Sequence, residues 1–176
     1  MGFRGPSFAA SSVIKPSGQK PQSKLWFHDG RWWGSLFVPG PDEHRVHRLD
    51  PITQVWVDTG TPLDDRNSSE GDVLWNGTHL YVASSSDSAG SPDATRVRVL
   101  RLTYDAASAR FVRDPSYDAA IPGGPVEAVV LDQDTTGRLW VTFTRGNAVD
   151  VAHTSGPPAD AWVRPPRPRH GEPRSG

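Results

Sequence analysis

The chain has 176 residues, of which 35% are apolar, with 17 glycines, 17 prolines and no cysteine. Its formal net charge of −1 at pH 7 provides no global field that would draw it to nucleic acid or to an acidic membrane surface. The lack of cysteine excludes disulfides, thiolate catalysis and cysteine-type zinc sites, while the glycine and proline content favours turns over helices.

Residues 1–23 are predicted to be a disordered leader. They contain an early Arg4 but no apolar run of the length that a signal peptide needs. No stretch of the chain approaches the roughly 18 apolar residues of a membrane span. The compartment therefore stays unknown: the expectation is cytoplasmic by default, and extracytoplasmic if the N-terminus is truncated.

Three copies of a glycine-closed hairpin follow. Each has an apolar strand, a turn that ends in glycine and an aromatic strand, and together they occupy 25–37, 73–83 and 131–144. The glycines of the three turns, Gly30, Gly77 and Gly137, recur 47 and 60 residues apart. This spacing is typical of one four-stranded propeller blade per repeat.

The repeats predict three blades, at about 24–60, 71–122 and 125–164. Short β-prone runs bounded by turn residues give these expected strands: 25–27, 32–38, 45–49 and 54–57; 72–75, 79–83, 95–104 and 110–113; 129–131, 139–143, 148–152 and 162–163. Residues 165–176 are rich in proline and arginine and are predicted to be a disordered tail.

Several segments inside the blades have two interpretations. The serine-rich loop at 84–94 is either a flexible insert that binds a ligand or a solvated connection without a function of its own, and the second interpretation is favoured. Arg96, Arg98 and Arg101 interleave with apolar residues, which predicts an outer strand whose basic face sees water. Trp140 is expected to be buried between blades.

The third copy, with Asp132, Gly137, Leu139, Trp140, Val141 and Thr144 in its spacing, resembles the blade repeat of two-component-regulator-type β-propellers and the broader sialidase-like group. The resemblance covers roughly 24–164. It implies an all-β fold, a partial β-propeller of about three four-stranded antiparallel blades. The motif builds the inner hairpin of a blade and carries no chemistry, and the Ser-x-Asp-x-Gly-x-Thr-Trp box of true sialidase repeats is absent.

Three blades are fewer than the four to eight with which a propeller closes. The outward faces of the first and third blades would then lie uncovered. The sequence thus favours a fragment of a larger propeller, with self-association of two copies or aggregation as the alternatives.

Propeller geometry places the candidate site residues on one loop face. The ligand-binding candidates are Asp64, Asp65, Arg66, Glu70 and Arg145. Asp72 and Glu127 are the catalytic candidates, because each precedes an inner strand and could act in a pair of carboxylates. The alternatives are that Arg66 simply neutralises Asp64 or Asp65, and that the two acids cap exposed backbone.

Two classes of function stay open. The leading one is a non-catalytic propeller module, or a piece of one, that presents its loop face to a glycan, a peptide or a protein. The other is a piece of a sialidase-like glycoside hydrolase or lyase. The six histidines show no metal-ligand spacing, and no cofactor motif is present, so no metal and no cofactor are expected.

Overall fold

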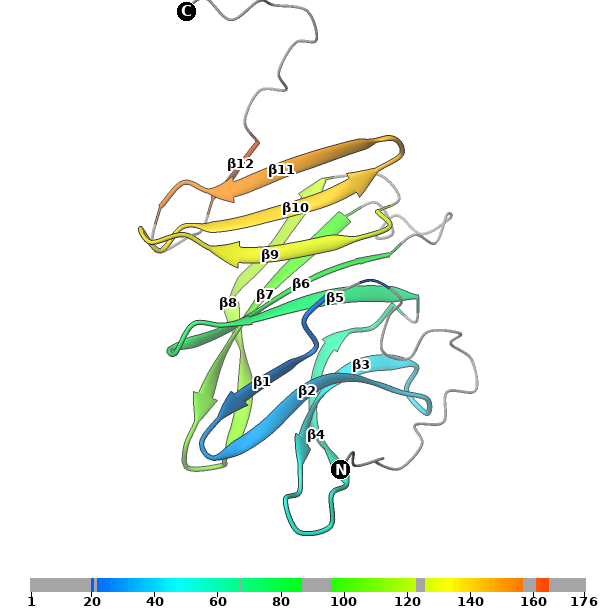
Figure 1. Cartoon of the computed structure of the whole chain (residues 1–176), viewed down its shortest axis with the longest axis vertical. Helices are drawn as coiled ribbons and strands as arrows, with labels where there is room; N and C mark the ends of the chain where they lie inside the picture. Colours follow the sequence, from blue (N-terminus) through cyan, green and yellow to red (C-terminus); the bar gives the residue numbers. More distant parts are fainter. Residues whose placement is uncertain are drawn as a thin grey trace, which may run out of the picture.

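The computed structural model describes residues 20, 22–66, 68–86, 96–122, 126–156 and 161–164. The leader before residue 20, residues 87–94 of the serine-rich loop and the tail from 165 lie outside these residues. The described chain forms three four-stranded antiparallel sheets, stacked one on another in Figure 1. No helix in this part of the chain could cross a lipid bilayer.

The strands follow one another within each sheet in chain order. The first sheet contains β1 (Leu25–His28), β2 (Arg31–Val38), β3 (Glu43–Leu49) and β4 (Trp56–Asp64). The second contains β5 (Ser69–Trp75), β6 (His79–Ser86), β7 (Arg96–Asp105) and β8 (Arg110–Pro122). The third contains β9 (Val129–Gln133), β10 (Leu139–Arg145), β11 (Ala148–Thr154) and β12 (Trp162–Val163).

Local turn chemistry explains the inner hairpins. Asp29 and Gly30 join β1 to β2 with φ of 50° and 69°, the pair of positive values that a tight two-residue hairpin requires. The β5–β6 turn is held by Asn76, whose Oδ1 accepts the backbone N–H groups of Thr78 and His79. In the third hairpin the acid that holds the turn is Asp134, which accepts N–H bonds from Thr136 and Arg138.

The three sheets pack face to face. β1 contacts β5 and β5 contacts β9, and these three first strands run in the same direction (Figure 1). Successive sheets stacked through their first strands are the arrangement of propeller blades. The predicted fold class, an all-β chain with three four-stranded antiparallel blades, is confirmed.

Apolar side chains fill both spaces between sheets. Between the first and second sheets lie Trp26, Trp33, Val46, Leu63, Val73, Leu80, Val82, Leu100, Leu102 and Phe111. Between the second and third sheets lie Tyr81, Ala83, Val97, Val99, Tyr117, Ile121, Val126, Val129, Leu131, Leu139, Val141, Phe143 and Ala152. The middle sheet is thus apolar on both faces, as an internal blade must be.

The outer strands are longer than their sequences predict. β4 continues to Asp64 and β8 to Pro122, where the sequence predicts strands that end at residues 57 and 113. Both strands contain an irregularity, because the register shifts between Arg45 and His47 opposite β4 and between Leu100 and Leu102 opposite β8. Such bulges interrupt the alternation from which a strand is recognised.

Two expectations about side chains are wrong. Trp140 is only half-buried, because it lies on the face of the third sheet that no other described sheet covers. Arg98 and Arg101 are not simply solvated. Arg98 forms an ion pair with Asp65, the residue that follows β4, and Arg101 forms one with Asp114 of its own sheet. Arg96, by contrast, is exposed.

Candidate functional site

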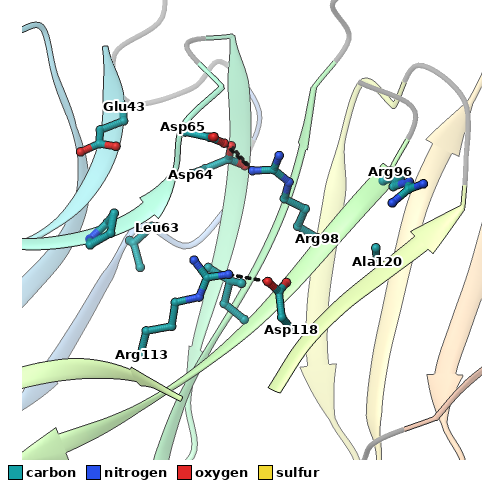
Figure 2. Close-up of a pocket in the computed structure, with 11 residues that line it drawn as sticks. Glu43, Leu63, Asp64, Asp65, Arg96, Arg98, Arg113, Asp118 and Ala120 are labelled. Atoms are coloured by element: carbon teal, nitrogen blue, oxygen red, sulfur yellow. Dashed lines mark hydrogen bonds and ion pairs between the residues drawn. The ribbon is translucent and has the colours of Figure 1, made fainter. Parts of the chain in front are cut away.

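A cleft lies between the outer strands of the first and second sheets. Its volume is about 660 Å³, in the range of small-molecule sites. Figure 2 shows β4 on one side and β7 and β8 on the other. The lining residues are Glu43, Pro62, Leu63, Asp64, Asp65, Arg96, Arg98, Leu100, Arg113, Asp118 and Ala120.

The bulge in β8 builds one wall of the cleft. Asp118 pairs in register with Leu100, whereas Arg113 pairs with Leu102, so the residues between them leave the ladder. The bulge is held by Asp114, whose Oδ1 accepts bonds from the backbone N–H and the hydroxyl of Ser116. Removal of 114–117 from the ladder brings Arg113 and Asp118 together, with 2.6 Å between Arg113 Nη2 and Asp118 Oδ2.

The end of β4 builds the opposite wall. Asp64 is 3% exposed, and its carboxylate accepts bonds from Arg66 Nε and Nη2, the latter at 2.6 Å. Arg66 also donates to the carbonyl of Arg96 and to Ser84 Oγ. Arg66 therefore neutralises Asp64, as one sequence interpretation proposed, and ties β4 to β6 and β7.

Asp65 is exposed and points to β7. Its Oδ1 lies 2.5 Å from Arg98 Nη1, and Arg98 also lies 3.5 Å from Asp64; Figure 2 shows Arg98 reaching across to both carboxylates. The pairing with Arg98 lowers the pKa of Asp65. The carboxylates of the cleft therefore stand beside guanidinium groups: Glu43 with Arg45, Asp64 with Arg66, Asp65 with Arg98 and Asp118 with Arg113.

The floor of the cleft is apolar. Leu63 and Leu100 are 3% and 1% exposed and belong to the core between the two sheets. Thr61 Oγ1 donates to the carbonyl of Phe111 at 2.8 Å, which joins β4 directly to β8 below the cleft. Since β4 and β8 are tied in this way, both walls have a fixed base.

A second polar region lies beside the first strands of the sheets. The segment just before β1, residues 22–24 together with Lys20, crosses from one sheet to the next. Its contacts are Lys20 Nζ to Glu127, Gln22 Nε2 to the Val129 carbonyl, the Val73 N–H to the Ser23 carbonyl and the Ser35 N–H to the Lys24 carbonyl. We call this segment the strap, because it ties all three sheets together.

Asp72 is a junction between the strap and the third sheet. Its Oδ1 accepts the Ser23 N–H at 2.5 Å, and its Oδ2 accepts the Leu131 N–H at 2.8 Å. Burial raises the pKa of Asp72, although these two bonds oppose the rise. Both oxygens of this candidate catalytic acid are thus engaged by backbone.

Buried titratable groups lie in the strap and beside it. Lys24 Nζ donates to the Gly71 carbonyl, and burial lowers the pKa of Lys24 although Glu70 and Asp72 lie near enough to raise it. Glu70 is 8% exposed. On the neighbouring β3, burial lowers the pKa of His44 to about 4, and His44 Nδ1 lies 3.2 Å from Ser69 Oγ.

The sequence-predicted site residues therefore fall into three places. Asp64 and Asp65 line the cleft, with Arg66 behind them. Glu70, Asp72 and Glu127 lie at the strap. Arg145 belongs to the third sheet, where its Nη2 lies 2.7 Å from Asp150 Oδ2.

Sequence reasoning did not select Arg98, Arg113 and Asp118 for this site. The sequence contains one signal for Arg98, because this charged residue alternates with the buried valines of β7 and so lies on the opposite face of the strand from them. Arg113 and Asp118 carried none, because the bulge that joins them is not encoded in strand alternation. In the described residues no three histidine or acidic side chains come together as a metal site.

No protein-family model matches the chain, and no curated protein matches it. Among solved structures it is similar to two crystal structures of exo-β-1,3-galactanase variants from Phanerochaete chrysosporium, both with β-1,3-galactotriose. In each case the identity is 10%, the TM-score is 0.34, and the match covers 89% of this chain and 52% of the other. The chain spans about half the length of these structures. The fold class rests on the sheet packing above, not on this likeness.

Proposed function

We propose that the chain is a non-catalytic β-propeller module that binds a glycan in the cleft between its first two sheets. The observation that carries the proposal is the pairing of an apolar floor, Leu63 and Leu100, with walls of ion-paired guanidinium and carboxylate groups. Each such pair offers donors and acceptors side by side.

Those walls suit a ligand rich in hydroxyl groups. A hydroxyl both donates and accepts a hydrogen bond, so it can bridge an arginine and its paired carboxylate without separating two charges. The C–H face of a sugar ring is apolar and can pack on Pro62 and Ala120, the exposed apolar residues that line the cleft beside the buried Leu63 and Leu100. A free carboxylate or ammonium ligand would instead compete with the existing pairs Arg98–Asp65 and Arg113–Asp118.

The strap region favours a structural role over catalysis. A general acid or base must reach the substrate proton within hydrogen-bond distance. Asp72 is 4% exposed and accepts two backbone N–H groups, while Glu127 forms an ion pair with Lys20. A glycosidase would in addition need its two carboxyl groups to flank one bond, and the contacts of Asp72 and Glu127 fit the strap better.

The first test is binding to an array of neutral and acidic oligosaccharides, followed by calorimetric titration of the strongest binder. A cleft variant, Arg113→Gln with Asp118→Asn, removes an exposed pair without changing net charge. A control variant, Lys20→Gln with Glu127→Gln, does the same at the strap. We expect the cleft variant to weaken binding at least about tenfold and the control to bind like the wild type.

The opposite pattern, with binding lost in the strap variant alone, would move the site to Glu127. Binding of peptides but of no glycan would replace the proposed ligand class. Release of reducing ends from the bound oligosaccharide, abolished by Glu127→Gln, would establish the hydrolase alternative instead.

A further inference from the structure

The first sheet exposes a large apolar surface on its outward side. Leu25, Phe27 and Trp32 are 48%, 54% and 48% exposed, and the register pairs Phe27 with Trp32. Trp56 joins them, because Gly34 leaves room: a Cβ at Gly34 would lie 2.9 Å from Leu25 Cδ2 and 3.3 Å from Trp56 Cζ3. We call these four residues the open face of the first sheet.

The third sheet has an uncovered apolar side as well. Val130, Val149 and Val163 are 48%, 68% and 43% exposed. Trp140 is half-buried among them, with its ring 4.6 Å from that of His153. These four apolar residues are the open face of the third sheet. Patches of this kind on one side of a sheet are typical of interaction surfaces.

The order in which the sheets stack shows what each open face would meet. Trp33 and Trp140 lie on β2 and β10, the second strands of the first and third sheets. Trp33 is fully buried by the second sheet, where its ring meets those of Tyr104 and Phe111. Because the sheets stack in chain order, the open face that carries Trp140 is the side of the third sheet that a following sheet would cover.

The open face of the first sheet corresponds to the other partner in such a contact. Trp32 lies on β2 of the first sheet and Leu139 on β10 of the third. Leu139 is fully buried against the preceding second sheet. The open face that carries Trp32 thus corresponds to the side of a sheet that packs onto the sheet before it.

We propose that two copies of the chain associate head to tail, the open face of the third sheet of each copy packing onto the open face of the first sheet of the other. The chain carries both partners of one sheet-to-sheet contact, and its own two internal contacts show that partners of this kind pack. Two copies supply six sheets, within the four to eight of a closed propeller. The two contacts close the pair when a two-fold axis relates the copies, so that each copy contributes both open faces.

Light scattering after size exclusion, at tens of micromolar, tests the pairing. The wild-type chain should have about twice its 19.2 kDa mass. Phe27→Lys and Val149→Lys each place a charge on one open face, at a residue exposed enough to leave the fold intact. Each variant alone should be monomeric, with a dissociation constant raised at least about tenfold. Val112→Lys, at an exposed residue of the second sheet, is the matched control and should stay paired.

Mixing the two variants gives the sharpest outcome. One of the two contacts then joins two unaltered faces, so a heterodimer of Phe27→Lys with Val149→Lys should form although neither variant pairs with itself. A monomeric wild type, an open-ended series of larger assemblies, a Val149→Lys variant that still pairs, or failure of the mixture to pair would each overturn the proposal.

Discussion

Trp33 and Trp140 both lie on the second strand of their sheets, but they differ in burial. Each is the third residue after its hairpin glycine, and each indole N–H is bonded locally, Trp33 to the His28 carbonyl and Trp140 to Asp134 Oδ2. Trp33 is 0% exposed under the second sheet, whereas Trp140 is half-buried. The neighbouring sheet, not the local sequence, decides how much each indole ring contributes to the stability of the fold.

The difference predicts unequal costs of truncation. Trp33→Ala should lower the free energy of unfolding by about 3–5 kcal/mol, the range for a large buried aromatic. Trp140→Ala should cost about 1–2 kcal/mol in the monomer, because part of its surface stays in water in the folded state. Urea unfolding of both variants in the Val149→Lys background separates folding from association. Equal costs would show that Trp140 is covered within one chain.

Asp72 should stabilise the fold through the strap. Asp72→Ala leaves the N–H groups of Ser23 and Leu131 without their acceptor, and each buried unsatisfied donor costs about 1–3 kcal/mol. We expect a loss of about 2–4 kcal/mol in urea unfolding. Glu127→Gln, which removes an exposed ion pair, should change stability by less than about 1 kcal/mol. An unchanged unfolding midpoint for Asp72→Ala would contradict the structural role.

The neighbouring acids Asp64 and Asp65 form a matched pair with different burial. Asp64→Ala strands the guanidinium of Arg66, whose side chain is 9% exposed, and loss of one partner of a buried pair costs about 3–5 kcal/mol. The side chain of Asp65 is 72% exposed, so Asp65→Ala should cost under about 1 kcal/mol. Thermal unfolding of the two variants measures this difference in stability. A larger loss for Asp65→Ala than for Asp64→Ala would refute the assignment of Asp64 as the buried partner of Arg66.

His44 should make the fold sensitive to mild acid. Its pKa is about 4 in the folded chain, below the ordinary 6.5, so the unfolded chain binds more protons between these values. The free energy of unfolding therefore falls as pH drops from 6.5 to 4, by about 3 kcal/mol from this group. His44→Gln should remove that part of the slope. Comparison with the wild type cancels the contributions of His47 and Asp72. Parallel curves of unfolding free energy against pH for the two proteins would contradict this role of His44.

The hairpins could be predicted from sequence because their signals are local. Gly30, Gly77 and Gly137 each close a turn within a few residues of the strands that they join. The narrower likeness to two-component-regulator or sialidase-like blades, the domain boundaries and the status as a fragment stay predictions. Lys20, Gln22 and Ser23, placed in the leader by sequence, bond to the second and third sheets through the strap.

The cleft could be predicted only in part. Asp64 and Asp65 follow one another in a polar segment and were selected for that reason. Arg98 lies 33 residues from Asp65 in the chain, and Arg113 meets Asp118 only through the β8 bulge. The strap contact between Lys20 and Glu127 spans 107 residues. Such pairings depend on how the sheets stack, which strand alternation does not encode.

The proposed function depends most on where a glycan binds. The most direct measurement is a ¹H–¹⁵N chemical-shift titration of the labelled chain with the oligosaccharide that binds best on the array. The predicted result is that the shifted amides cluster at Asp64, Asp65, Arg98, Arg113 and Asp118, on β4, β7 and β8. Shifts centred instead on Ser23, Asp72 and Glu127 would contradict the cleft assignment and place the ligand at the strap.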